Sequence, residues 1–144
     1  MNEPLSPARP CILRVLIATQ SAPMGAVLAS FLDDPADIRC EVVSLTDDLY
    51  LTLSRAQPPV VNVVLLDLEP WPANVLHTVH AMKDRATPLL VLALAHSVGQ
   101  SMQRRCHEAG VDHLLDRTAD LGRLQSMMAD YAKTQRSKAM QRQE

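Results

Sequence analysis

The chain has 144 residues, 47% of them hydrophobic, and a formal net charge of −2 at pH 7. This length suits one domain with a real hydrophobic core, and the ordinary composition argues against wholesale disorder. The near-zero charge and the low aromatic content of 3% argue against a protein built mainly to bind nucleic acid or a membrane surface.

The amino-terminal segment lacks the features of a targeting signal. Residues 1–10 contain three prolines and no apolar run, so we expect a flexible arm rather than a signal peptide. No apolar stretch approaches the length that spans a bilayer. Cys11, Cys40 and Cys106 form no C-x-x-C motif, which is typical of reduced thiols in a cytoplasmic protein. We therefore expect a cytoplasmic protein that does not contact a membrane.

The first half of the chain alternates strand and helix patterns. Cys11–Ala18 is an almost wholly apolar strand, and Ser21 can cap a helix over Pro23–Leu32, since Pro is tolerated in the first turn. Ile38–Leu45 alternates only partly, which favours a strand near a sheet edge, and residues 46–56 predict a second helix. The inner face of the first helix is expected to hold Met24, Val27, Leu28, Phe31 and Leu32.

The middle of the chain holds the segment around which the prediction is organised, Val60–Pro70 (VVNVVLLDLEP). Its apolar run without alternation indicates a strand buried on both faces, as in the middle of a parallel sheet. The run ends on Asp67, and functional residues of open α/β sheets lie at the carboxyl ends of the strands. Asp67 is therefore either a simple turn residue or the acidic centre of a pocket.

The second half continues the alternation. A helix is predicted over Ala73–Met82, with Val75, Leu76 and Val79 inward, and a strand over Leu89–Ala95. A helix over Gly99–Ala109 and a strand over Val111–Leu115 follow. The last helix is predicted from Ala119 onward with Thr118 as its cap, and its inward residues are Leu121, Leu124, Met127 and Met128. Gly110 should take the left-handed conformation just past its helix.

Five alternating strand and helix units predict an α/β fold. Short connections imply right-handed crossovers, a parallel sheet and helices on both faces. The length suits the flavodoxin-like five-stranded order 2-1-3-4-5. In domain terms, we expect a flexible arm over residues 1–10, one domain over 11–131, and a basic C-terminal extension of the last helix over 132–144.

Over about Leu13–Met128 the chain resembles the receiver domains of bacterial two-component response regulators. The matching segments are RVLIA (Arg14–Ala18), NVVLLDLEP (Asn62–Pro70), TPLLVLALA (Thr87–Ala95) and EAGVDHLLDR (Glu108–Arg117). The resemblance implies two acidic residues after the first strand that bind Mg²⁺ and an Asp after the third that accepts phosphate. It also implies a Ser or Thr after the fourth strand, an aromatic switch residue on the fifth, and a Lys after it.

The phosphoacceptor position is retained as Asp67, but the other positions depart from the family pattern. The replacements are Thr19 and Gln20 for the acidic pair, Ala95 (or Ala93 by a second alignment) for the hydroxyl residue, Leu114 for the aromatic, and Arg117 for the Lys. Mg²⁺ takes carboxylate oxygens in strict octahedral geometry, so a pocket with one carboxylate should bind it weakly. Phosphoryl transfer depends largely on that metal, and we therefore expect no efficient phosphorylation.

These departures predict a degenerate receiver domain with no enzymatic activity, no cofactor and no bound metal. Its function would be that of a protein-interaction module in bacterial signalling or transcription control, independent of Mg²⁺-dependent phosphorylation. Two alternatives stay open. One is a receiver that is phosphorylated on Asp67 within a phosphorelay, and the other is a small-ligand sensor whose pocket lies near Thr19, Gln20 and Arg117.

Arg117 has two interpretations. Its guanidinium can grip the Asp67 carboxylate with two hydrogen bonds, as Lys cannot, and this ion pair would hold the pocket in one state. Alternatively, it is solvated near the end of the fifth strand. A structure in which the two side chains point apart would contradict the ion pair.

The resemblance implies a partner or dimer surface on the fourth helix, fifth strand and fifth helix. Candidates for a self-association patch there are Met102, Leu121, Met127 and Met128. The segment Tyr131–Glu144 carries an excess of Lys and Arg (Lys133, Arg136, Lys138 and Arg142), which suits an acidic partner or RNA. Apart from this tail, contact with nucleic acid would need an effector domain absent from this sequence.

Overall fold

The computed structural model describes residues 13–34, 37–44, 61–68, 75–83, 89–96 and 98–142. Its elements are β1 (Leu13–Thr19), α1 (Ala22–Leu32), β2 (Ile38–Ser44), β3 (Val63–Asp67), α3 (Val75–Lys83), β4 (Leu90–Ala95), α4 (Gln100–Ala109), β5 (His113–Asp116) and α5 (Leu121–Arg142). The arm over residues 1–10 and the helix predicted over 46–56 lie outside the described residues. None of the helices in the described ranges is long and apolar enough to cross a membrane.

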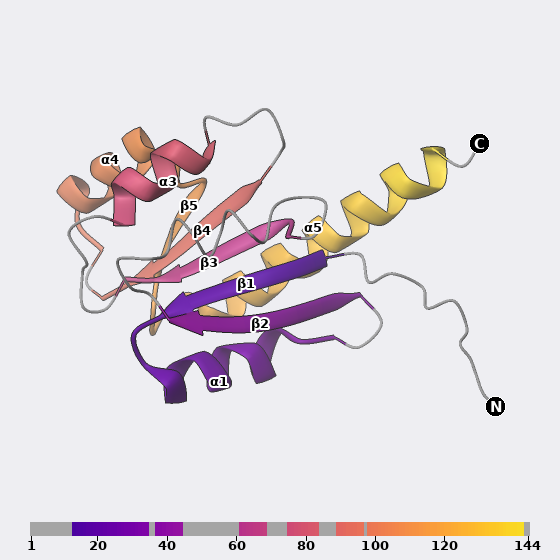
Figure 1. Cartoon of the computed structure of the whole chain (residues 1–144), viewed down its shortest axis with the longest axis horizontal. Coiled ribbons are helices and arrows are strands. Elements are labelled where there is room, and N and C mark those ends of the chain that lie inside the picture. Colours follow the sequence, from indigo (N-terminus) through magenta and orange to yellow (C-terminus); the bar gives the residue numbers. More distant parts are fainter. Residues whose placement is uncertain are drawn as a thin grey trace.

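The five strands form one parallel sheet in the order β2-β1-β3-β4-β5, which confirms the predicted topology (Figure 1). The partly alternating strand β2 lies at an edge, as predicted, whereas the apolar strands β1, β3 and β4 lie inside the sheet. Every residue of β3 is buried. Because the strands are parallel, Thr19, Asp67 and Ala95 end their strands at the same edge of the sheet.

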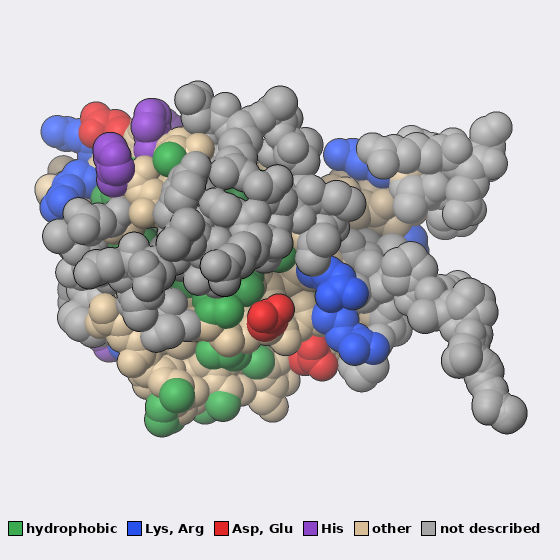
Figure 2. Space-filling view, viewed as in Figure 1, with side chains coloured by type: hydrophobic (Ala, Val, Ile, Leu, Met, Phe, Trp, Pro, Cys, Tyr) green, Lys and Arg blue, Asp and Glu red, His purple; other side chains and the backbone are tan. Residues whose placement is uncertain are grey.

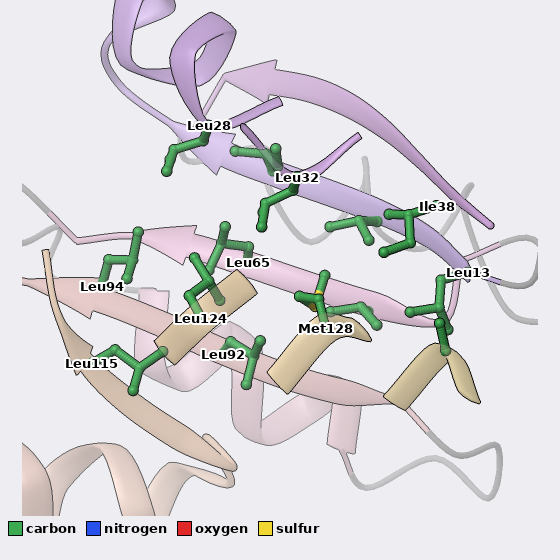
Figure 3. Packing of buried hydrophobic residues seen from close by; sticks show 14 residues of the cluster. Leu13, Leu28, Leu32, Ile38, Leu65, Leu92, Leu94, Leu115, Leu124 and Met128 are labelled. Atoms are coloured by element: carbon green, nitrogen blue, oxygen red, sulfur yellow. The ribbon is translucent and has the colours of Figure 1, made fainter. Parts of the chain in front are cut away.

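Alternate residues of the strands pack against helices on opposite faces of the sheet. One apolar cluster lies under α1 and α5 and contains Leu28, Leu32, Leu124 and Met128 (Figure 3). The other lies under α3 and α4 and contains Val75, Val79 and Cys106. Both faces of the sheet are therefore covered by helices, as predicted. The edge that holds Thr19, Asp67 and Ala95 adjoins these two packed apolar clusters.

Helix α1 begins as predicted but buries a different stripe. The Ser21 hydroxyl accepts a hydrogen bond from the Met24 N–H at 3.2 Å, which confirms Ser21 as the cap. Leu28 and Leu32 are buried, but the inward placement of Val27 and Phe31 was wrong, because their exposed fractions are 59% and 38%.

The reason for the different stripe is the close approach of Gly25 to the sheet. A Cβ at this position would lie 2.5 Å from Val42 Cγ1 and 2.9 Å from Thr19 Cγ2. Gly25 therefore sets the rotation of α1, and the buried stripe runs through residues 25, 28 and 32. Counting apolar residues could not reveal this, since the residue that packs most closely has no side chain.

The turns that follow α4 and β5 differ in how well the sequence predicted them. Gly110 has a φ of 101°, which confirms the left-handed residue after α4. The predicted cap Thr118 was wrong, because α5 begins at Leu121 and the carboxylate of Asp116 organises the turn before it. Asp116 accepts hydrogen bonds of 2.8 Å from the N–H groups of Thr118 and Ala119.

Helix α5 is continuous from Leu121 to Arg142, so the predicted boundary at residue 131 falls within one helix. Ala132 is buried in the same apolar cluster as Leu124, and Arg136 forms an ion pair with Asp37, next to β2. The division into a domain over 11–131 and a basic extension of the last helix over 132–144 stays a prediction.

The packing of Gly25 gives the first testable prediction. Gly25→Ala should lower the free energy of unfolding by about 1–2 kcal/mol, because the added methyl group overpacks the contact with Thr19 and Val42 by more than the helix gains from Ala. Urea denaturation measures the change. Gly122→Ala is the matched control, since nothing lies within 4 Å of a Cβ there, and it should cause no loss. Equal losses in both variants would contradict the close approach of α1.

Candidate functional site

The carboxylate of Asp67 is the centre of the candidate site. Asp67 is the last residue of β3, and its exposed fraction is 0%. The strand continues its pairing past this point, because the Leu68 N–H donates to the Leu94 carbonyl oxygen at 2.9 Å. The side chain is thus fixed in the interior of the sheet edge, and an ionised carboxylate in that position needs partners from the protein.

Thr19 supplies the shortest of these contacts. Its Oγ1 donates to Asp67 Oδ2 at 2.7 Å and accepts from the Ser21 N–H at 3.0 Å, so the hydroxyl is held from both sides. Thr19 is itself only 3% exposed. The sequence patterns indicated Thr19 as a replaced acid or as part of a ligand pocket, but not as a hydrogen-bond donor to Asp67. The sequence did contain a signal for this contact, because Thr19 ends β1 and Asp67 ends β3, the strand beside it.

Arg117 lies on the other side of the carboxylate. The ladder between β4 and β5 ends with the Arg117 N–H donating to the Ala95 carbonyl oxygen at 2.9 Å, which places the side chain beyond the strand end. Arg117 Nη2 lies 3.5 Å from Asp67 Oδ2, and the Arg117 side chain is 14% exposed. The two side chains face each other, but the bidentate geometry was wrong: one nitrogen contacts the carboxylate, beyond the usual hydrogen-bond distance.

Two buried polar atoms of this pair have no hydrogen-bond partner within the part of the chain that the structure describes: Asp67 Oδ1 and Arg117 Nε. One is an acceptor and the other a donor, so a modest rotation of the guanidinium toward a side-on geometry would satisfy both. The carboxylate is therefore bonded firmly to Thr19 and only loosely to Arg117.

Of the remaining predicted positions, three are apolar and the fourth, Gln20, is exposed. Ala95 is 1% exposed and Ala93 is fully buried, so either alignment places a methyl group in the family's hydroxyl position. Leu114 is partly buried and packs against the apolar cluster under α3 and α4. Gln20 is exposed, next to Thr19.

The loop that carries Arg117 is held by two carboxylates that sequence analysis missed. Asp116 accepts the N–H groups of Ala119 and Thr118, and these bonds hold its pKa below the ordinary value. In return, Asp120 accepts the Asp116 N–H at 2.8 Å. The two acids, four residues apart, close the turn between β5 and α5 and thereby set the position of Arg117.

The described residues contain no group of three or more His, Cys, Asp or Glu side chains that could hold a metal ion. The two cysteines in the described ranges are free thiols, and burial raises the pKa of both Cys40 and Cys106 to about 11. Both thiols are therefore held in the protonated form near neutral pH, which makes them weak nucleophiles.

The sequence matches no protein-family model and no curated protein. Its structure, however, is similar to solved structures of receiver domains. A response regulator from Thermotoga maritima has 12% sequence identity and a TM-score of 0.68, with 84% of this chain and 98% of that chain covered.

Two further neighbours widen the comparison. The receiver domain of Ssk1 from Saccharomyces cerevisiae, solved in complex with the histidine phosphotransfer protein Ypd1, has 18% identity and a TM-score of 0.69, covering 85% of this chain and 90% of that one. A Burkholderia pseudomallei protein named for a relation to pilus assembly has 15% identity and a TM-score of 0.71, covering 86% and 91%. At these identities the similarity establishes that the chain has the receiver-domain fold.

The contact between Thr19 and Asp67 gives a prediction for stability. Thr19→Val keeps the shape of the side chain but removes the donor, so it should lower the free energy of unfolding by about 1–3 kcal/mol by leaving a buried carboxylate poorly satisfied. Thr19→Ser keeps the hydroxyl and should recover part of the loss. Denaturant titration at neutral pH measures both. If Val were as stable as wild type and Ser were less stable, the hydroxyl would not be the stabilising group.

The turn at Asp116 gives a prediction for pH dependence. Because its folded-state pKa is lowered from 3.8, the carboxylate adds stability above that pH, and this stability is lost as the pH falls through the folded-state pKa. The advantage of wild type over Asp116→Asn should therefore shrink as the pH is lowered from about 5 to about 2. Thermal melts across this range measure the difference in Tm. A difference that stays constant with pH would contradict the assignment.

Proposed function

We propose that this receiver-fold domain is a degenerate receiver, a protein-interaction module of bacterial signalling or transcription control that works without Mg²⁺-dependent phosphorylation. One observation carries the proposal: the retained acid, Asp67, is fully buried, and the hydroxyl of Thr19 bonds to it from a position that the family gives to a metal-binding acid. In this account, the residues that operate a switch in the family have become a buried polar contact at the edge of the hydrophobic core.

The residues of the pocket do not fit the Mg²⁺ ion that the fold family implies. A hard cation of this kind is bound through carboxylates, phosphates and water in octahedral geometry. Among the described residues, Asp67 is the one carboxylate at the end of β1, β3 or β4, and its Oδ2 is already bonded to Thr19. The Arg117 cation beside it would also repel a divalent ion.

The positions that would read out a phosphoryl group are also altered. Ala95 offers no hydroxyl, and Leu114 has no ring to exchange between two rotamers coupled to such a bond. A bound group shifts a conformational equilibrium only through contacts that differ between the two states. With those contacts replaced by methyl groups, the domain would act in one conformation and present a constant surface to its partners.

The proposed partner surface includes α4, β5 and α5, but its character is polar. A groove of about 740 Å³ lies along α4 and β5, lined by Gln103, Arg104, His107 and His113 among others. Of the four residues predicted to form an apolar patch, Met128 was wrong, since it is 1% exposed and belongs to the core. The other three, Met102, Leu121 and Met127, are partly buried against the two clusters. A polar contact suits a partner protein better than a stable dimer.

A phosphorylatable receiver is the second candidate. It is favoured by the retained Asp67 and by its Oδ1, which has no partner within the described residues. A small-ligand sensor is less well supported, because Thr19 and Arg117 already face the carboxylate. We retain a cytoplasmic location, a non-enzymatic role and the basic end of α5 as a contact for an acidic partner within the same proposal.

Incubation with acetyl phosphate and Mg²⁺ tests the proposal directly. We expect intact-mass spectrometry to find no phosphate adduct, because Thr19 and Gln20 replace the acidic pair that would hold the Mg²⁺ ion, which neutralises charge on the transferred group. A response regulator with a complete acidic pocket, treated in the same reaction, is the positive control. An adduct on this chain that disappears in Asp67→Asn would overturn the proposal and establish the second candidate.

A further inference from the structure

The exposed large apolar side chains of the described residues lie on α1 and β2 rather than on α4 or β5. The large hydrophobic residues exposed by more than a third are Val27 and Phe31 on α1 and Val42 on β2. Figure 2 shows hydrophobic side chains at the surface over α1, along the lower border of the view. Val27 and Phe31 are four residues apart and therefore lie on the same side of the helix. Exposed apolar side chains that cluster in this way mark interaction sites more often than scattered ones do.

A crevice of about 480 Å³ runs beside Phe31, between the C-terminal half of α1 and the middle of α5. Its lining includes core residues, Leu32, Ile38 and Met128, so its floor is apolar. Ser126 and Ala129 on α5 line the opposite wall, and both are small and exposed. A hydrogen bond joins the two helices across it, from Gln125 Nε2 to the Phe31 carbonyl oxygen at 3.2 Å.

The rim of this crevice is acidic. Asp33 and Asp34 follow the last turn of α1, are exposed, and line the crevice. Asp33 uses one oxygen to accept the Cys40 N–H at 3.2 Å, which keeps its negative charge at the rim. Among the described residues that line the crevice there is no Lys or Arg. An apolar floor with an anionic end is complementary to an apolar stripe that ends in cations.

We propose that the α1–α5 crevice, defined by Phe31, Leu32, Ile38, Ser126, Met128 and Ala129 with the rim of Asp33 and Asp34, binds an amphipathic helix with Lys or Arg beside its apolar stripe, supplied by a partner protein. Helix binding in a groove uses apolar anchors spaced by three or four residues, which the small wall residues of α5 allow to approach closely. The proposal rests on the proposed function only in that both assign the domain a binding role. It concerns a different face and does not depend on whether Asp67 is phosphorylated.

The test uses two synthetic peptides on the order of 15 residues long, with the same leucine stripe and either lysines or glutamates on the polar face. Fluorescence anisotropy measures affinity, and backbone NMR signals locate binding. We expect the lysine peptide to bind more tightly than the glutamate peptide and to shift signals near Phe31 and Ala129. Asp33→Asn with Asp34→Asn, which keeps the acceptor for Cys40, should reduce the preference for lysine.

Two variants and a matched control distinguish binding in the crevice from nonspecific binding. Ala129 is exposed on α5, and Ala129→Arg would fill the crevice with a cation. This variant should weaken the binding of the lysine peptide at least about tenfold. Phe31→Gln should also weaken it. Ser137→Arg is the matched control, because it adds the same cation at another exposed position of α5 that does not line the crevice, and it should bind like wild type.

The proposal is wrong if neither peptide shifts the crevice signals, if both peptides bind equally well, or if Ser137→Arg weakens binding as much as Ala129→Arg. It is also wrong if sedimentation shows that the chain self-associates and Ala129→Arg abolishes that association, since a second copy would then be the occupant. None of these outcomes affects the acetyl phosphate experiment, and a phosphate adduct would leave the crevice proposal intact.

Discussion

The hydrogen bond from the Thr19 hydroxyl to the Asp67 carboxylate is the constraint on which this account of the molecule depends. It joins the ends of two interior strands, at a distance of 2.7 Å and away from solvent. A buried carboxylate must be compensated by the protein, and here a neutral donor and a loosely placed guanidinium provide the compensation. The Thr19 hydroxyl occupies one carboxylate oxygen, Oδ2, and the Arg117 cation lies beside it, so both groups oppose the binding of a divalent cation there. In the proposed account, this one bond both stabilises the fold and takes the place of the family's switch.

The strand order and most helices could be predicted because their signals are local and strong. Apolar runs without alternation marked β1, β3 and β4 as interior strands, and Gly110 and Ser21 marked two helix ends. The site could be placed for a related reason: parallel strands bring Thr19, Asp67 and Arg117 to one edge whatever the details of packing. Once the strand order is known, it therefore predicts which strand-end residues lie close together.

Geometry within that neighbourhood could not be predicted. The rotation of α1 follows from how closely Gly25 approaches Thr19 and Val42, which depends on three elements at once. The position of the Arg117 guanidinium follows from the turn that Asp116 and Asp120 close, and composition alone suggested Thr118 as the cap. The first error concerns a tertiary contact of a residue without a side chain, and the second concerns local hydrogen bonds of two short acidic side chains within one turn. Such contacts leave no periodic signal in the sequence, yet they determine which face of α1 is exposed and how Arg117 is oriented toward Asp67.

The measurement that tests the central claim most directly is the backbone NMR spectrum of the isotopically labelled chain with and without Mg²⁺ and beryllofluoride, a mimic of the phosphoryl group on a carboxylate. If the bond between Thr19 and Asp67 has replaced the metal site, the signals of Thr19, Asp67, Ala95 and Leu114 should remain unchanged at saturating reagent. Shifts at Asp67 that extend through Leu114 into α4 would show a working switch and contradict the account.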